Sequence, residues 1–247
     1  MDRLIYTAVT GMNASLRREQ VIASNMANAQ TIGFKAEIVE SSPMTLEGPQ
    51  LEVRAMTTTE VRGVSMKDGS VTQTGHALDV AMQGDALLAV QAPDGVEAYT
   101  RRGDLSVTVT GVLQTGEGLP VIGENGPITI PPGSALSISP DGSLLIADPA
   151  TPDQPPVRID RLKLVSPAGT RIAKGMAGQF RVVGGGVLPI DENARLISGA
   201  LEQSNVNPSE VLVEMISAQR LFDMRTKLVK TAGDLDEAGA RLMRLDS

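Results

Sequence analysis

The sequence predicts an α+β fold in which helices at the two ends of the chain pair with each other and an all-β region of many short strands lies between them. Apolar residues recur at helical spacing in the first thirty residues and again in the last forty. Between these segments, glycine and proline turn signals separate short alternating polar and apolar runs. The sequence shows no regular alternation of strands and helices, which disfavours a doubly wound nucleotide-binding fold.

The N-terminal helix is expected to start at Asp2, which can cap it, and to continue to about residue 30. If residues 3–30 are all helical, the helix is about 40 Å long at ~1.5 Å per residue. Gly33 is expected to close the last turn as the C′ residue in a left-handed conformation. The apolar stripe of this helix consists of Ile5, Val9, Met12 and Leu16.

The middle of the chain, residues 76–199, is predicted to be an all-β domain, either a sandwich or an irregular barrel. Turn signals recur in it at residues 93–95, 124–127 and 140–142. The preceding residues 36–75 are rich in Thr, Val and Glu without a clear period. We expect them to form an extended arm that leads into the β domain.

The C-terminal segment opens with a helix start signal. Asn207 is the predicted N-cap, with Pro208 at the first helical position and Glu210 at the third. Further on, apolar residues keep a 3.5-residue period, which is typical of a coiled coil. This predicted seam consists of Leu221, Met224, Leu228, Leu235, Leu242 and Leu245. Upstream the stripe shifts to Val211, Met215, Ala218 and Phe222, where the seam can change partner.

A single helix with one apolar stripe is not stable alone in water, so the two terminal helices are expected to bury their stripes against each other. The formal charges of the two terminal segments are consistent with this pairing. Residues 1–35 carry four basic and two acidic residues, and residues 200–247 carry six basic and eight acidic ones, so the pair is +2 against −2. The sequence therefore predicts a discontinuous helical assembly domain made of residues 1–35 and 200–247.

The composition of the chain excludes several classes of function. A net charge of −7 and 2% aromatic residues argue against nucleic acid as a partner. The chain has no cysteine, and His76 is its only histidine, so thiolate metal sites, Fe–S clusters and Cys nucleophiles are impossible. It also lacks a P-loop, a G-x-S-x-G elbow and EF-hand spacing. We predict no catalytic residue, no cofactor and no metal.

The sequence also bears on membranes and export. No stretch approaches the roughly 20 apolar residues that span a bilayer, so we expect no membrane span. No signal-peptide pattern opens the chain. The absence of cysteine, and hence of disulfides, fits residence in the cytosol and equally an export route that passes chains unfolded.

Motifs at both ends of the chain resemble those of bacterial flagellar rod and hook proteins. Residues 23–35, ASNMANAQTIGFK, are similar to that family's N-terminal signature A-[NS]-N-[LIM]-A-N-x-x-T-x-G-F-[KR]. Residues 198–207, SGALEQSNVN, are similar to its element G-x-L-E-x-S-N-V-[ND]. Residues 99–101, Tyr-Thr-Arg, also fit the family pattern, and residues 1–8 and 161–165 are similar to its proximal rod members.

The resemblance implies a structural subunit of the flagellar basal-body rod, which crosses the periplasm. Terminal helices of such subunits form the inner layer of a tubular shaft that transmits torque, with the β domain outside. The implied partners are copies of this chain, other flagellar rod proteins and the flagellar type III export apparatus. The family motifs are then hinges between the layers, and their residues here are Asn25, Asn28, Thr31, Gly33, Phe34, Lys35, Gly199, Leu201, Glu202, Ser204, Asn205, Val206 and Asn207.

Two alternatives remain open at this point. One is a distal rod or hook-base relative in the same family. The other, from a different class, is an exported β-domain enzyme that acts on the cell wall and is anchored by its helices. Residues 84–88, Gly-Asp-Ala-Leu-Leu, depart from the G-x-G-F-F of many relatives. For Asn25 and Asn28, capping of the helix end and contact with a neighbouring subunit are equally open.

Overall fold

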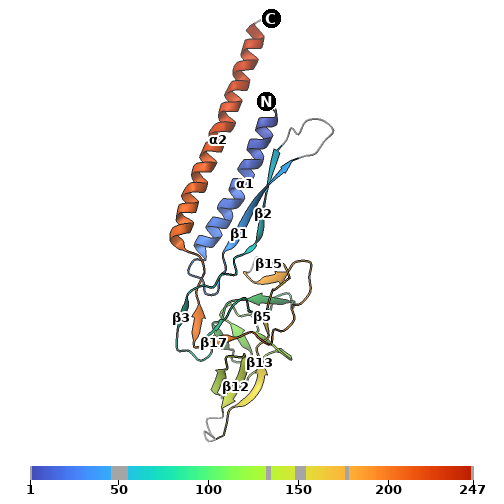
Figure 1. The fold of residues 1–247 in the computed structure, drawn as a ribbon, viewed down its shortest axis with the longest axis vertical. Helices are drawn as coiled ribbons and strands as arrows, with labels where there is room; N and C mark the ends of the chain where they lie inside the picture. Colours follow the sequence, from blue (N-terminus) through green and yellow to red (C-terminus); the bar gives the residue numbers. More distant parts are fainter. Residues whose placement is uncertain (1, 46–54, 132–134, 148–153, 176–177, 246–247) are drawn as a thin grey trace. The chain divides into compact units, whose positions relative to one another are not determined.

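The computed structural model describes residues 2–45, 55–131, 135–147, 154–175 and 178–245. The chain forms two compact units (Figure 1). The helical unit comprises Met1–Ala27, Glu37–Arg62 and Asn207–Ser247, and the β unit comprises Asn28–Ala36 and Gly63–Val206. Helices at both ends of the chain with many strands between them confirm the predicted α+β class.

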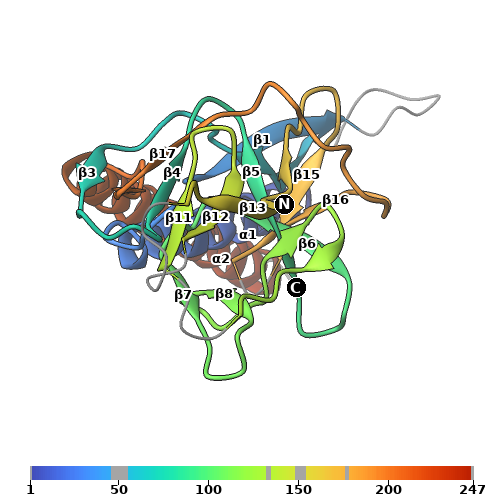
Figure 2. The same cartoon turned by 90° about the horizontal axis from the view of Figure 1, so that it is seen from below.

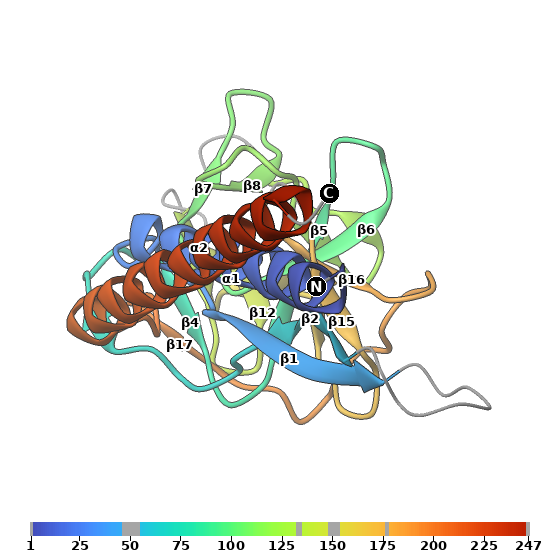
Figure 3. The same ribbon diagram turned by 90° about the horizontal axis from the view of Figure 1, so that it is seen from above.

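The helical unit contains α1 (Asp2–Ala27) and α2 (Pro208–Leu245), which lie side by side and run in opposite directions (Figures 1 and 3). Two strands, β1 (Glu37–Thr45) and β2 (Ala55–Val64), pair in a two-stranded sheet, and β1 packs near α1. The start of α2 is as predicted, because the Asn207 side-chain oxygen accepts the Ser209 N–H at 3.0 Å. Among the described residues, no helix is long and apolar enough to cross a membrane.

The β unit is built from short strands in several small sheets (Figure 2). Its strands are β3 (Val71–Gln73), β4 (Val80–Met82), β5 (Leu87–Gln91), β6 (Glu97–Thr100), β7 (Leu105–Val107), β8 (Leu113–Thr115), β9 (Ile122–Gly123), β10 (Gly126–Pro127), β11 (Ala135–Ile138), β12 (Ser143–Ala147), β13 (Val157–Arg161), β14 (Leu164–Val165), β15 (Ile172–Lys174), β16 (Phe180–Val182), β17 (Leu196–Ser198) and β18 (Ala200–Glu202). The largest sheet has the order β14-β5-β6-β16-β15, and its neighbours are antiparallel.

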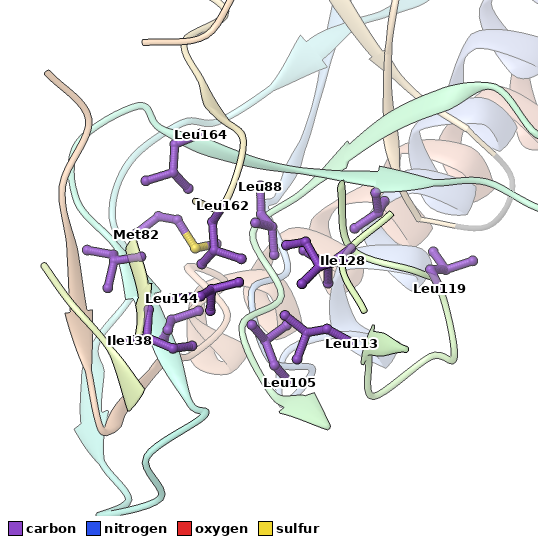
Figure 4. Close-up of a cluster of buried hydrophobic side chains, with 14 of the residues drawn as sticks. Met82, Leu88, Leu105, Leu113, Leu119, Ile128, Ile138, Leu144, Leu162 and Leu164 are labelled. Atoms are coloured by element: carbon purple, nitrogen blue, oxygen red, sulfur yellow. The ribbon is translucent and has the colours of Figure 1, made fainter. Parts of the chain in front are cut away.

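The centre of the β unit is β5, which is buried on both of its faces. Leu88 and Val90 belong to the larger apolar cluster, part of which Figure 4 shows, and Leu87 and Ala89 belong to a second one. Because successive strand residues point to opposite faces, this arrangement explains why β5 is a continuous apolar run. The second cluster also contains Tyr99 and Leu188, and the Tyr99 hydroxyl oxygen accepts the Leu188 N–H at 2.6 Å.

The boundaries between the units differ from those we expected. The C-terminal motif was expected in the helical domain, but β18 pairs with β3 in the β unit, where Ala200, Leu201 and Glu202 are buried. The predicted arm, residues 36–75, is divided. Its first part pairs as β1 and β2, its last part joins the β unit, and its residues 46–54 lie outside the described residues. The pairing of β18 with β3, two segments far apart in sequence, places both residues 200–202 and the end of the predicted arm in the β unit, whereas β1 and β2 are consecutive strands that pair with each other.

Candidate assembly surface and motif junction

In the helical unit, one face of α2 turns toward α1. Its members recur every seven residues, and we call them the α1-facing stripe: Val211, Ala218, Arg225 and Ala232. The three apolar members are buried. An Arg225 guanidinium nitrogen, Nη1, donates to the Gly11 carbonyl oxygen and to the Ser15 hydroxyl oxygen of α1. The buried residues of α1 are likewise small or medium in size: Gly11, Ala14, Ser15, Val21, Ile22 and Asn25.

The predicted coiled-coil seam of α2 lies beside the α1-facing stripe and is largely exposed. We call its described residues the leucine stripe: Leu221, Met224, Leu228 and Leu235. Leu221 is partly buried, whereas Met224, Leu228 and Leu235 are 56%, 60% and 58% exposed. The side chains of Leu242 and Leu245 lie outside the described part of the chain. Leucines at this exposure are unpartnered apolar surface within the single chain.

The predicted stripe of α1 has the same character. Val9 and Leu16 are exposed, and Met12 is partly buried. The side chain of Ile5 lies outside the described residues. The helices therefore pair, but Val9, Leu16, Met224, Leu228 and Leu235 are not buried in the pair as we expected. The buried side of α2 instead contains the predicted upstream stripe, Val211, Met215, Ala218 and Phe222, together with Ala232, and Arg225 adds hydrogen bonds to α1.

In the β unit, the two family motifs meet at a buried ion cluster, which we call the motif junction: Lys35, Arg101 and Glu202. The Lys35 ammonium donates to Glu202 Oε1 at 2.7 Å, and Arg101 Nε donates to Glu202 Oε2 at 2.7 Å. All three side chains are at most 1% exposed. Glu202 is thus a single buried carboxylate between two buried cations, an arrangement that is costly to disturb.

Further hydrogen bonds complete the motif junction. Arg101 also donates to the carbonyl oxygens of Ala86 and Met82, at 2.8 and 3.1 Å. Lys35 donates to the Lys67 carbonyl oxygen at 2.7 Å. Burial lowers the pKa of the Lys35 ammonium below its ordinary value of 10.5, and the hydrogen bond to Glu202 opposes that effect.

Gly33 has a different role from the helix cap that we expected. Since α1 ends at Ala27, Gly33 is not its C′ residue. Its N–H donates to the Glu202 carbonyl oxygen at 2.8 Å, and its φ is +67°. A Cβ atom at this position would lie 2.4 Å from the backbone of Arg101. Glycine is therefore required here both by the backbone conformation and by the space available.

The motif asparagines bind backbone groups of neighbouring segments. Asn205 accepts the Ala36 N–H at 2.8 Å and donates to the carbonyl oxygens of Ser65 and Lys67, both at 2.9 Å. In the helical unit, Asn25 accepts the Glu37 N–H at 2.9 Å and donates to the carbonyl oxygen of the same residue at 3.1 Å. Asn25 therefore holds the start of β1 to the end of α1.

The other motif residues also have local partners in the β unit. Thr31 donates its hydroxyl to Asn28 Oδ1 at 3.2 Å, and the Lys174 ammonium lies 3.3 Å from the centre of the Phe34 ring. Ser204 accepts the Val206 N–H at 3.2 Å. Three more motif residues complete the set: Leu201 and Val206 are buried, and Gly199, with φ +74°, turns the chain between β17 and β18.

Two residues of these sites were missing from the sequence-based prediction. Arg101 carried a signal, because it ends the Tyr-Thr-Arg element that resembles the family. Arg225 carried a weaker one, because it interrupts the seven-residue repeat of Ala218 and Ala232 with a charge. Neither signal shows which residues these arginines bind.

Comparison with known proteins agrees with this arrangement of motifs. The family described as flagella basal body rod protein matches residues 5–35. The family described as flagellar hook protein FlgE/F/G D1 domain matches residues 81–146. The family described as flagellar basal body rod FlgEFG protein C-terminal matches residues 197–242. The first and third matches contain Lys35 and Glu202, and the second contains Arg101.

Full-length relatives decide the family. The flagellar basal-body rod protein FlgF of Salmonella typhimurium is 38% identical over 99% of this chain and 100% of its own length. That of Escherichia coli is 40% identical over 95% of each chain. The chain belongs to the flagellar basal-body rod protein family. The rod protein FlgG of Bacillus subtilis is 29% identical over 99% of this chain and 100% of its own length. Membership makes the chain a structural subunit of the flagellar basal-body rod.

Proposed function

We propose that this chain is a proximal rod subunit that assembles through the leucine stripe of α2 and the exposed stripe of α1 into a tubular shaft that transmits torque. The observation that carries the proposal is the leucine stripe itself, which remains on the surface after α1 and α2 have paired. A rod must grow by contacts that do not close on themselves, and apolar stripes along a helix supply such contacts. Copies of this chain and other rod proteins are the proposed partners.

Export through the flagellar type III apparatus is part of the same proposal, since the rod is assembled outside the cytoplasm. We assign no catalytic role to the chain. If the chain is instead a cell-wall enzyme, the purified protein should turn over peptidoglycan fragments. Under our proposal it should not turn them over. In the distal-rod alternative the subunit lies in the distal part of the rod rather than in the proximal part. Imaging of labelled subunits in isolated basal bodies can distinguish the two positions.

The leucine stripe is tested by Leu228→Asp. Full burial of a leucine contributes roughly 1.5–3 kcal/mol, and because Leu228 is still 60% exposed, about 1–2 kcal/mol per subunit is left for assembly. A carboxylate would add a desolvation cost there. We expect the purified variant to keep its helix content and its thermal unfolding but to enter isolated basal bodies poorly.

The matched control is Thr226→Asp, which adds the same charge to an exposed position of α2 on the side away from the leucine stripe. This variant should enter rods at nearly the wild-type level. If Leu228→Asp enters rods as readily as Thr226→Asp does, the leucine stripe is not an assembly surface.

A further inference from the structure

Two apolar stripes on α2 compete for the same partner helix. The α1-facing stripe includes Ala218, Arg225 and Ala232, and the leucine stripe includes Leu221, Leu228 and Leu235, so both repeat every seven residues. The two stripes are offset by three residues, which on an α-helix is a rotation of about 60°. A modest rotation of α2 about its own axis would therefore exchange them.

Apolar area does not by itself decide between the two arrangements. In the observed rotation Met215, Phe222 and Val229 are partly buried beside the α1-facing stripe, and the exchange would turn them outward while it turned the leucine stripe inward. The structure places Ala232 at 7% exposure and Leu228 at 60%. A directional polar contact can therefore decide the rotation.

Arg225 is the polar contact that distinguishes the two rotations. Its guanidinium donates to the Gly11 carbonyl oxygen and to the Ser15 hydroxyl oxygen. The guanidinium packs directly over Gly11, since a Cβ atom built there would lie in ordinary van der Waals contact, 3.5 Å from Arg225 Cζ and Nε. Rotation by 60° would carry Arg225 away from both acceptors, and no leucine of the other stripe can donate in its place. Charge-assisted hydrogen bonds of this kind are directional, and a polar residue in an apolar seam sets the register of paired helices.

We infer that Arg225 selects which stripe of α2 faces α1 and thereby keeps the leucine stripe on the surface for contact with another subunit. The use of the leucine stripe rests on the proposed function. The selection itself is a property of the single chain and can be measured without assembly.

Because the chain contains no cysteine, a single introduced thiol reports the rotation of α2. Leu228→Cys and Ala232→Cys are made separately and treated with a maleimide in the purified full-length chain. With Arg225 present, the thiol at 228 should react faster than the thiol at 232. In the Arg225→Ala background, which removes both hydrogen bonds without adding a leucine to the α1-facing stripe, the ratio of the two rates should invert, while the helix content stays at the wild-type level. Arg225→Lys, which keeps the charge, should retain the original order.

Assembly is the second readout. Arg225→Ala should lose incorporation into basal bodies to the same extent as Leu228→Asp, although every leucine of the stripe is intact. The matched control is Arg220→Ala, which makes the same change at an exposed position of α2 and should leave both the rate ratio and incorporation unchanged.

Several outcomes would overturn the inference. One is an unchanged rate ratio in Arg225→Ala. Another is rapid reaction of both thiols in Arg225→Ala and also in Arg225→Gln, because Arg225 would then be needed for folding of the helix pair rather than for selection. An inverted ratio with normal incorporation would support selection by Arg225 and contradict the proposed role of the leucine stripe. The two proposals can therefore fail separately.

Discussion

Replacing the central carboxylate of the motif junction, Glu202→Gln, should destabilise the β unit strongly. Glutamine keeps the shape of the side chain but removes the charge that lies between Lys35 and Arg101, both of which are at most 1% exposed. Leaving buried cations without their partner costs about 3–5 kcal/mol. In a domain of this size each kcal/mol lowers the melting temperature by roughly 2–4 °C, so we expect a decrease of about 6–20 °C.

The assay is scanning calorimetry of the full chain, and the control is Asp68→Asn. Asp68 also binds Arg101, at 3.2 Å, but its side chain is 63% exposed. Exposed ion pairs contribute about 0–1 kcal/mol, so this variant should melt within a few degrees of wild type. The double variant Lys35→Met with Glu202→Gln should be more stable than the sum of the single changes implies, because the two side chains interact directly. Equal melting temperatures for Glu202→Gln and Asp68→Asn would refute the reasoning.

Three further predictions concern other positions. Gly33→Ala should destabilise the β unit by more than the roughly 1–2 kcal/mol of a left-handed alanine, because its Cβ would also meet the Arg101 backbone; urea denaturation measures this. Burial raises the pKa of Tyr99 to about 12, so the folded chain keeps a proton that the unfolded chain loses near pH 10. The resulting stabilisation, about 2–3 kcal/mol, is complete below pH 10 and lost as the pH rises to 12, and Tyr99→Phe should abolish that alkaline decline in denaturation curves. His76→Ala should leave motility intact at normal protein level, because His76 is exposed and we assign it no chemistry; loss of motility would point to a specific contact or to the enzyme alternative.

Local signals in the sequence were sufficient for the start of α2. The N-cap at Asn207 and the first helical position at Pro208 depend on residues within one turn of each other, and both are found as predicted. The seam that begins at Leu221 and the upstream stripe that contains Ala218 were also visible, since helical periodicity marks which residues share a face. The motifs at residues 23–35 and 198–207 indicated the family before any contact was known, because the spacing of several residue types is preserved within them.

Only the tertiary structure decided which of these features meet. Periodicity places the stripes led by Ala218 and by Leu221 on α2, but the choice between them depends on Gly11 and Ser15, which lie at the other end of the chain. The motif junction likewise joins Lys35, Arg101 and Glu202, three charges that alone look like solvated surface residues. Their burial follows from strand pairing and from a close backbone approach. Such contacts link residues distant in sequence, and no local pattern encodes them.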